Sequence, residues 1–346
     1  MSDVWVAFCE ARKPPKQEKE CPLSCGCSFY LCIMITQQIQ IDLHLPQSWN
    51  HCTTDELESI AAAIINEQQR VDKYHPFDWG RVKLNIVLAV NDITVRKSFS
   101  PDDEEWLVER PQDSEPWPIS TGQLLSLTER LAWVDDEKAN KIIFLFPYPT
   151  LDVRCKKEEG RAISHQTSSI IHLQGPPPLL DGYTWKEYRW LTDWMQEYIR
   201  QTNAMAQVTS DELRVKHQAA LDQVRNEFLA ILFRPKGDNA GKLTASTFEG
   251  FEPVKWQVIL FWWSSLMLQL QRKFPKVFKP QSIGKGKRPQ KDTPWDFYNR
   301  VTATIQKYIG GLSSHDVDDQ PYGVTLQQLE MMADEAAEME KLKHKK

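Results

Sequence analysis

The most apolar stretch of the chain, "VILFWWSSLMLQL" from Val258 to Leu270, sets the main constraint on how this protein folds. A helix that crosses a bilayer needs about 20 predominantly apolar residues in a row. This stretch is shorter, and it contains Ser264, Ser265 and Gln269. We therefore expect the segment to lie in a protein interior, and we expect no interaction with a membrane.

The spacing of its large side chains predicts a helix from Val254 to Phe274. Apolar residues recur at alternating intervals of four and three, which places them on one seam of a helix: Trp256, Leu260, Trp263, Met267, Leu270 and Phe274. A second apolar face carries Ile259, Trp262 and Leu266. A helix that is apolar on nearly all sides is usually a buried central helix. The alternative is that these apolar residues form a groove that binds a partner protein.

Composition excludes several classes of protein. The 346 residues suggest two domains, or one large domain with appendages. A net charge of −5 gives no general attraction to nucleic acid or to an anionic membrane. The cysteine count is odd, at 7, and most of the cysteines fall in the first 32 residues. This distribution does not indicate a secreted disulfide framework, so we expect a reducing, cytoplasmic location.

Residues 1–33 differ from everything that follows, because they combine clustered cysteines with a Pro-Pro pair and no periodicity. Cys21, Cys25, Cys27 and Cys32 could form a zinc site, but paired C-x2-C spacings and a well-placed histidine pair are missing. We favour the interpretation that translation begins at Met34, which would make residues 1–33 a disordered or non-native extension.

Residues 34–150 predict a small mixed α/β region. Strands are expected at 39–45, 82–90 and 93–99 because apolar and polar residues alternate there. Capping boxes at Thr53–Glu56 and Ser120–Gln123 predict two helices, the second running to about Trp133. The apolar run 141–146 is either a buried strand or a short buried segment.

Residues 151–182 predict a Pro-rich connector, and residues 183–346 predict an α-helical domain. Three consecutive prolines in "GPPPLLDG" exclude regular structure other than an extended stretch. Beyond Gly182 the helix start signals are Thr184–Glu187, Thr209–Glu212, Thr293 with Pro294, and Thr325–Gln328. The fold class is therefore mainly α (α+β), with a small mixed α/β N-terminal region followed by an α-helical bundle.

The sequence predicts no catalytic, cofactor-binding or metal-binding residues, and we expect a non-enzymatic protein. The motifs H-E-x-x-H, G-x-S-x-G and G-x-G-x-x-G do not occur, nor does an EF-hand loop. His165, His172 and His217 lack companions for a metal site, so exposed histidines, and a core histidine at 217, are the favoured interpretations. The pairs Asp135-Asp136 and Asp318-Asp319 are expected to cap helices or to be solvated.

Two surfaces could bind a macromolecule. The last helix offers an adaptable apolar stripe for a partner helix, with docking on its own bundle as the alternative; its residues are Leu326, Leu329, Met332, Ala336 and Met339, continued by Leu342. The second surface is a basic segment, residues 272–291, which could follow nucleic-acid phosphates or form a solvated loop. Its basic residues are Arg272, Lys273, Lys276, Lys279, Lys285, Lys287, Arg288 and Lys291.

The stretch "LPQSWNHCTTDELESIAAAI" at 45–64 resembles a group of uncharacterised proteins from prophage-like modules of Bacteroidales. "YTWKEYRWLTDWM" at 183–195 and "KWQVILFWWSSLMLQLQRKFPKVF" at 255–278 are similar to the same pattern, whereas residues 1–33 depart from it. The resemblance implies a phage-derived tail-assembly accessory or chaperone-like protein with protein partners such as phage tail components, and it implies no catalytic residues. The leading hypothesis is therefore a non-enzymatic assembly factor, with a nucleic-acid-binding accessory protein as the alternative.

Overall fold

The computed structural model describes residues 43–71, 74–97, 105–113, 115–136, 141–156, 168–208, 210–236, 243–278, 294–310 and 313–343. Within these ranges it contains ten α-helices and two three-stranded sheets. The predicted class, mainly α (α+β), is confirmed. The zinc prediction at Cys21–Cys32 and the start at Met34 lie outside the described residues.

The chain forms two compact units whose segments alternate along the sequence. Unit 1 comprises Met1–Gln47 and Asp78–Asp135, and unit 2 comprises Ser48–Phe77 and Asp136–Lys346. Residues 48–77, which the sequence places in the mixed region, therefore group with the helical part.

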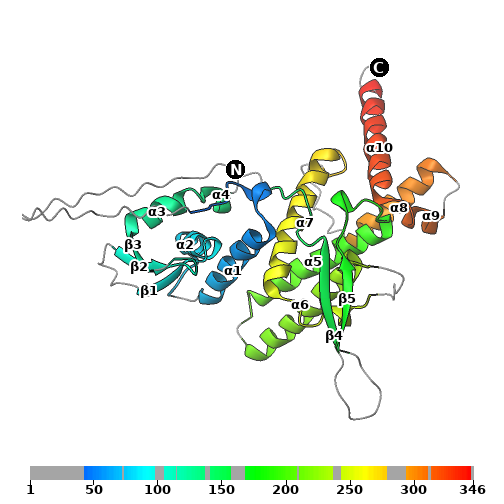
Figure 1. Ribbon diagram of the computed structural model, residues 1–346. Helices are drawn as coiled ribbons and strands as arrows, with labels where there is room; N and C mark the ends of the chain where they lie inside the picture. Colours follow the sequence, from blue (N-terminus) through cyan, green and yellow to red (C-terminus); the bar gives the residue numbers. More distant parts are fainter. Residues whose placement is uncertain are drawn as a thin grey trace, which may run out of the picture. The chain divides into compact units, whose positions relative to one another are not determined.

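Unit 1 combines an antiparallel sheet with three helices (Figure 1). Its strands are β1 (Thr94–Lys97), β2 (Glu105–Glu109) and β3 (Trp117–Ser120), in the order β1-β2-β3. Its helices are α2 (Trp79–Val90), α3 (Thr121–Glu129) and α4 (Ala132–Asp135). The capping box predicted at Ser120 is present, although the predicted helix to Trp133 is divided between α3 and α4.

The strand predicted at 82–90 is wrong, because this segment is helix α2. The Asp78 side chain caps the helix by accepting hydrogen bonds from the N–H groups of Gly80 at 2.8 Å and Arg81 at 3.4 Å. The buried residues Val82, Ile86 and Val87 follow helical spacing. The apolar residues of this stretch fit both periods, so the pattern alone could not distinguish a helix from a strand.

The strand predicted at 39–45 is not formed in its described end, residues 43–45. The Asn91 side chain holds this segment instead. Its Oδ1 accepts the His44 N–H at 2.7 Å, and its Nδ2 donates to the His44 carbonyl at 2.9 Å. One buried amide thus satisfies the backbone groups that a neighbouring strand would otherwise pair with.

Unit 2 is built around α7 (Pro253–Lys273), the helix that contains the opening stretch. Its other helices are α1 (Thr54–Arg70), α5 (Trp185–Met205), α6 (Asp211–Leu232), α8 (Pro294–Ile309), α9 (Ser314–Asp318) and α10 (Tyr322–Lys343). Its sheet has the order β4-β5-β6, made of β4 (Thr150–Lys156), β5 (Ser168–Gln174) and β6 (Arg234–Pro235). Residues 151–182, predicted as a connector, therefore contain a β-hairpin with a short 3-10 turn at Pro178–Leu180.

The central position of α7 is confirmed. Trp262 and Trp263 are only 3% and 5% exposed. Phe228 of α6 lies edge-on to Trp263, with ring centroids 5.2 Å apart, and Phe146 lies edge-on to Trp262 at 4.8 Å. Burial of each large side chain stabilises the fold by roughly 1.5–3 kcal/mol before conformational entropy is subtracted.

The segment 141–146 is irregular rather than a strand. Ser265 of α7 satisfies its backbone, because the hydroxyl accepts from the Ile143 N–H at 2.6 Å and donates to the Ile143 carbonyl at 3.1 Å. Ser265, a polar residue in the most apolar stretch, thus holds the backbone of the 141–146 segment against α7. No strand partner is needed at this point.

Helices α1 and α5 begin at the capping boxes predicted at Thr53 and Thr184. The starts predicted at Thr209 and Thr325 differ from the structure. The N-cap of α6 is Ser210, without a side-chain cap, and Thr209 lies outside the described residues. α10 begins at Tyr322 rather than near Thr325. Its start is fixed by pairing with the turn before α5, where the Tyr322 N–H donates to the Tyr183 carbonyl at 3.0 Å.

Candidate functional site

The predicted partner stripe on α10 changes from buried to exposed along the helix. Leu326 is 1% exposed, whereas Met339 is 59% and Leu342 is 60% exposed. Leu329 and Met332 are half-buried and Ala336 is exposed. Docking on its own bundle therefore accounts for the first turns of α10, which contact α5 and α8. The assignment of the remaining turns to a partner stays a prediction.

Only part of the predicted basic segment can be located. Lys279, Lys285, Lys287, Arg288 and Lys291 lie outside the described residues. Lys276 forms an ion pair with Asp334 of α10, and Lys273 lies 5.5 Å from the Phe274 ring centroid. The backbone N–H groups of Lys276 and Val277 both donate to the Glu330 carboxylate at 3.0 Å. The described part of the segment thus anchors α10, and phosphate binding stays a prediction.

The histidines considered as metal ligands pair with single side chains. His172 Nδ1 lies 2.7 Å from Asp152 Oδ1, and half-buried His217 Nδ1 lies 2.8 Å from Gln201 Oε1. His165 lies outside the described residues. In the part of the chain that the structure describes, no three histidine, cysteine or acidic side chains are placed to hold a metal ion together.

Cys52 is the one cysteine described with its side chain environment, and it is not poised as a nucleophile. Burial, followed by the charge of Glu56, raises the pKa of its thiol to about 12. The Sγ donates to the Ser48 carbonyl at 3.4 Å. Because the thiolate is the reactive form, this thiol stays protonated and inert at neutral pH.

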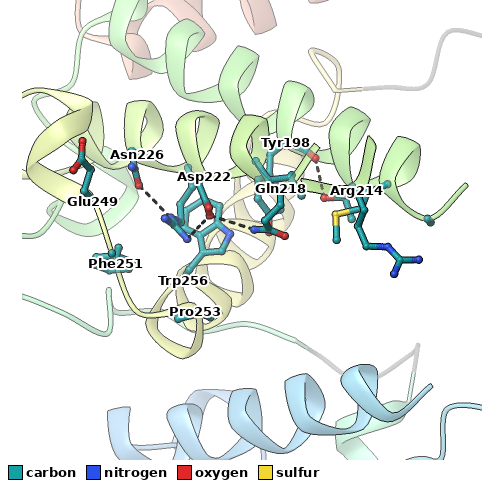
Figure 2. A pocket seen from close by; sticks show the side chains of 15 residues that line it. Tyr198, Arg214, Gln218, Asp222, Asn226, Glu249, Phe251, Pro253 and Trp256 are labelled. Carbon is teal, nitrogen blue, oxygen red and sulfur yellow. Dashed lines mark hydrogen bonds and ion pairs between the residues drawn. The ribbon is translucent and has the colours of Figure 1, made fainter. Parts of the chain in front are cut away.

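A cleft of about 840 Å³ opens between α5, α6 and the start of α7, and we call it the central cleft (Figure 2). Tyr198 and Trp256 form part of its wall, with ring centroids 5.1 Å apart, and burial raises the pKa of Tyr198. Figure 2 shows Gln218, Asp222 and Asn226 projecting from α6 on the side of Trp256.

Asp222 and Arg225, two of the four charged residues that line the central cleft, pair with each other, whereas Arg214 and Glu249 lie outside this pair. Arg225 is 9% exposed; its Nη1 lies 3.0 Å from Asp222 Oδ1, and its Nε donates to Asn226 Oδ1 at 3.2 Å. Gln218 donates to the same Asp222 oxygen at 3.3 Å. A buried guanidinium with this set of partners is a closed network that holds α6 in shape. The Asp222–Arg225 part of the cleft therefore offers little uncompensated charge to a ligand.

A second depression of about 760 Å³ lies on α5, α6 and β6, and we call it the acidic groove. Four carboxylates and one guanidinium are among its lining groups. They come with two tryptophans at helical spacing on α5; the residues are Glu187, Trp190, Asp193, Trp194, Glu197, Glu227 and Arg234. No site was predicted from the sequence on this face of α5. The signal was present, since 190, 193, 194 and 197 recur at intervals that bring them to one helix face.

Among the described residues, no helix is both long enough and apolar enough to traverse a bilayer. Comparison with known proteins gives no further guide to the site: no protein-family model, no curated protein and no solved structure matches this chain.

Proposed function

We propose that the protein is a non-enzymatic interaction protein that binds a helical segment of a partner protein through the distal half of α10, residues 336–343. The observation that supports this is the gradient of exposure along one helix, from 1% at Leu326 to 59% at Met339. The apolar spacing continues to Met339 and Leu342, whose side chains are more than half exposed. Single exposed apolar residues are common on protein surfaces, but a continuous stripe is typical of helix pairing.

The chemistry expected of the partner follows from the side chains in the stripe and beside it. Met331 and Met339 are 53% and 59% exposed, and methionine adapts its shape to irregular partner surfaces. Glu338 is exposed in the same turns as Met339. A matching helix would carry an apolar stripe with lysine or arginine at its flanks, because opposite charges at the rim favour encounter and exclude wrong partners.

The proximal half of α10 would serve as the mount for this surface. Leu326 is buried against unit 2, and Glu330 and Asp334 contact residues 276 and 277. Tyr308 of α8 donates to Glu335 Oε1 at 2.6 Å. A helix held at one end presents its other end in a defined direction, which reduces the entropy lost on binding.

We further propose the biological setting that the sequence resemblance implies, a cytoplasmic, phage-derived tail-assembly accessory or chaperone-like factor. The support is the similarity of 45–64, 183–195 and 255–278 to prophage-module proteins. Recognition of a partner helix is one way to perform such a role, so the α10 surface and the setting are compatible.

The test uses the full chain and a synthetic amphipathic helix of about three heptads with lysine flanks, labelled for fluorescence anisotropy. We expect saturable binding, weakened about tenfold by Met339→Gln. A matched control is Val215→Gln, which changes an apolar residue that is 71% exposed on α6. A truncation that removes 336–346 should abolish binding and leave the unfolding midpoint unchanged, whereas a cut before buried Leu326 would remove part of the core.

Three outcomes would overturn the proposal. Equal binding of a peptide with glutamate flanks would show that the flanking charge does not select the helix, and equal binding of the Met339→Gln variant would show that the stripe does not. Self-association of the chain that Met339→Gln abolishes, seen by sedimentation at rising concentration, would assign the stripe to a second copy instead of a partner protein.

A further inference from the structure

We infer that the docked start of α10, residues 320–328, is a latch: it opens more readily than the rest of unit 2 and releases α10 from α5 and α8. Two independent features of the closed latch carry this inference. One is a strained turn that is joined to the start of α10, and the other is a group of buried oxygens without hydrogen-bond partners. The opening does not depend on the proposed function, whereas its consequence for a partner rests on that function.

The latch is closed by contacts between the starts of α5 and α10. The Trp185 N–H donates to the Gln320 carbonyl at 2.7 Å, and the Tyr322 N–H donates to the Tyr183 carbonyl at 3.0 Å. The Tyr322 ring stacks on the Tyr188 ring, with centroids 4.9 Å apart. Two backbone hydrogen bonds and one ring stack therefore define the closed state at this end of α10.

The closed latch is joined to a strained turn, residues 178–182. Leu179 and Leu180 follow one another with positive φ angles of 53° and 55°. This left-handed conformation is unfavourable for any residue with a Cβ and is rare for a bulky side chain. The Tyr322 hydroxyl donates to the Leu179 carbonyl, so the start of α10 holds the turn directly. Backbone strain of this kind is typical of switch regions, and its relaxation on release of Tyr322 favours the open state.

The closed latch also buries polar atoms that form no hydrogen bond. Gln320 Oε1, Thr325 Oγ1 and Gln328 Oε1 are buried without a partner among the described residues. The same is true of Thr302 Oγ1 on α8, a helix that α10 contacts. Native structures retain few such atoms, because each loses its hydrogen bonds to water without replacement. Opening would return these atoms to water, so the cost of closure falls at the same place as the strain.

Opening would lengthen the surface that the proposed function assigns to a partner helix. Leu326 is 1% exposed and Met339 is 59% exposed, although both belong to one apolar stripe. The chain itself therefore occupies the proximal part of this stripe, through α5 and α8, which contact α10. Release of α10 makes both parts available at once. The latch is thus an autoinhibitory contact for a partner helix long enough to use the whole stripe.

The experiment is amide hydrogen exchange of the full chain, followed by mass spectrometry at rising urea concentrations below the unfolding transition. A released α10 is an isolated helix, which is marginally stable in water, so its amides exchange when the latch opens. We expect peptides from 322–334 to exchange at least about tenfold faster than peptides from α7, with little dependence on urea. Equal rates with the same urea dependence would overturn the inference, because α10 would then open only when unit 2 unfolds.

Two variants should tighten the latch and slow exchange at 322–334 several-fold. Thr325→Val keeps the shape of a fully buried side chain and removes its unpartnered hydroxyl. Leu179→Gly removes the penalty of the positive φ at a half-buried position. Unchanged or faster exchange in either variant would overturn the inference.

Matched controls separate these effects from those of the substitution itself. Thr128→Val changes a buried threonine whose hydroxyl does have a partner, the Leu125 carbonyl at 2.7 Å. Val71→Gly places a glycine at the end of α1, where φ is an ordinary −63°. Neither control should slow exchange at 322–334. A control that slowed it as much as its test variant would contradict the corresponding feature of the latch.

The consequence for a partner is tested with the lysine-flanked helical probe described above. Thr325→Val should bind this probe several-fold more weakly than the parent chain, although Thr325 is fully buried in the closed state and cannot touch the probe there. Unchanged affinity in this variant would overturn the autoinhibitory role. Absence of probe binding by the parent chain would contradict the proposed function instead, because exchange measures the opening without any partner.

Discussion

Helices α7 and α10 have nearly the same length, 21 and 22 residues, and both carry apolar residues at helical spacing, yet their surroundings differ. α7 is covered along its length, by α1, by the 141–146 segment and by α6. α10 contacts α5 and α8, and its side chains change from buried at Leu326 to more than half exposed at Met339 and Leu342. The spacing of apolar residues fixes which face of a helix can be buried. Whether it is buried depends on which other segments reach it.

The largest expected effect tests the α7 side of this comparison. Trp262→Ala should lower the free energy of unfolding by about 3–5 kcal/mol, because the indole is 3% exposed and Phe146 loses its edge-on partner. Leu268→Ala on the same helix is the control, since Leu268 is 38% exposed and should change stability by under about 1 kcal/mol. Urea denaturation measures both, and equal losses would contradict the central position of α7.

The next effect tests whether α10 is divided into two halves. Leu326→Ala should destabilise by about 2–5 kcal/mol, as truncation in a core does. Met339→Ala, 13 residues later on the same helix, should change stability by under about 0.5 kcal/mol, because its side chain is 59% exposed. Thermal unfolding of the two variants gives the comparison, and similar losses would mean that the distal half is part of the core.

Two adjacent serines on α7 sharpen the contrast between faces of one helix. Ser265 is fully buried and satisfies both the N–H and the carbonyl of Ile143. Ser265→Ala should destabilise by about 1–3 kcal/mol, the cost of unpaired buried polar groups. Ser264→Ala is the matched control, since Ser264 is exposed and donates only to the Leu260 carbonyl of its own helix. A similar loss in both variants would show that the contact to Ile143 does not stabilise the fold.

The fold could be predicted where local chemistry decides it. The capping boxes at Thr53, Ser120 and Thr184 and the helical course of α7 depend on residues close in sequence, and they are confirmed. The prediction of a strand at 82–90 was wrong because the apolar pattern of this segment fits both the helical and the strand period. The predicted start of α10 was wrong because the actual start is set by a hydrogen bond to Tyr183, which is distant in sequence.

The candidate site was less accessible to prediction for a physical reason. The α10 stripe was visible, but its division into buried and exposed halves depends on where α5 and α8 end against it. The acidic groove was missed because two of its faces belong to different helices. The pattern on α5 becomes meaningful only when Glu227 of α6 and Arg234 of β6 are placed beside it. Sequence periodicity reports the side chains of one element, whereas a groove is formed by several elements.

The smallest expected effect concerns the junction where α10 meets the end of α7. The Lys276–Asp334 pair is about half exposed, at 44% and 53%, and exposed ion pairs contribute about 0–1 kcal/mol. A double-mutant cycle with Lys276→Ala and Asp334→Ala should give a coupling below about 1 kcal/mol that shrinks at high salt. Glu330→Ala should have the larger effect, about 1 kcal/mol. Glu330 accepts from the backbone N–H groups of Lys276 and Val277, in the turn that follows α7. A larger coupling in the cycle than the loss from Glu330→Ala would mean that the side-chain ion pair, rather than these backbone hydrogen bonds, fixes α10 to the rest of unit 2.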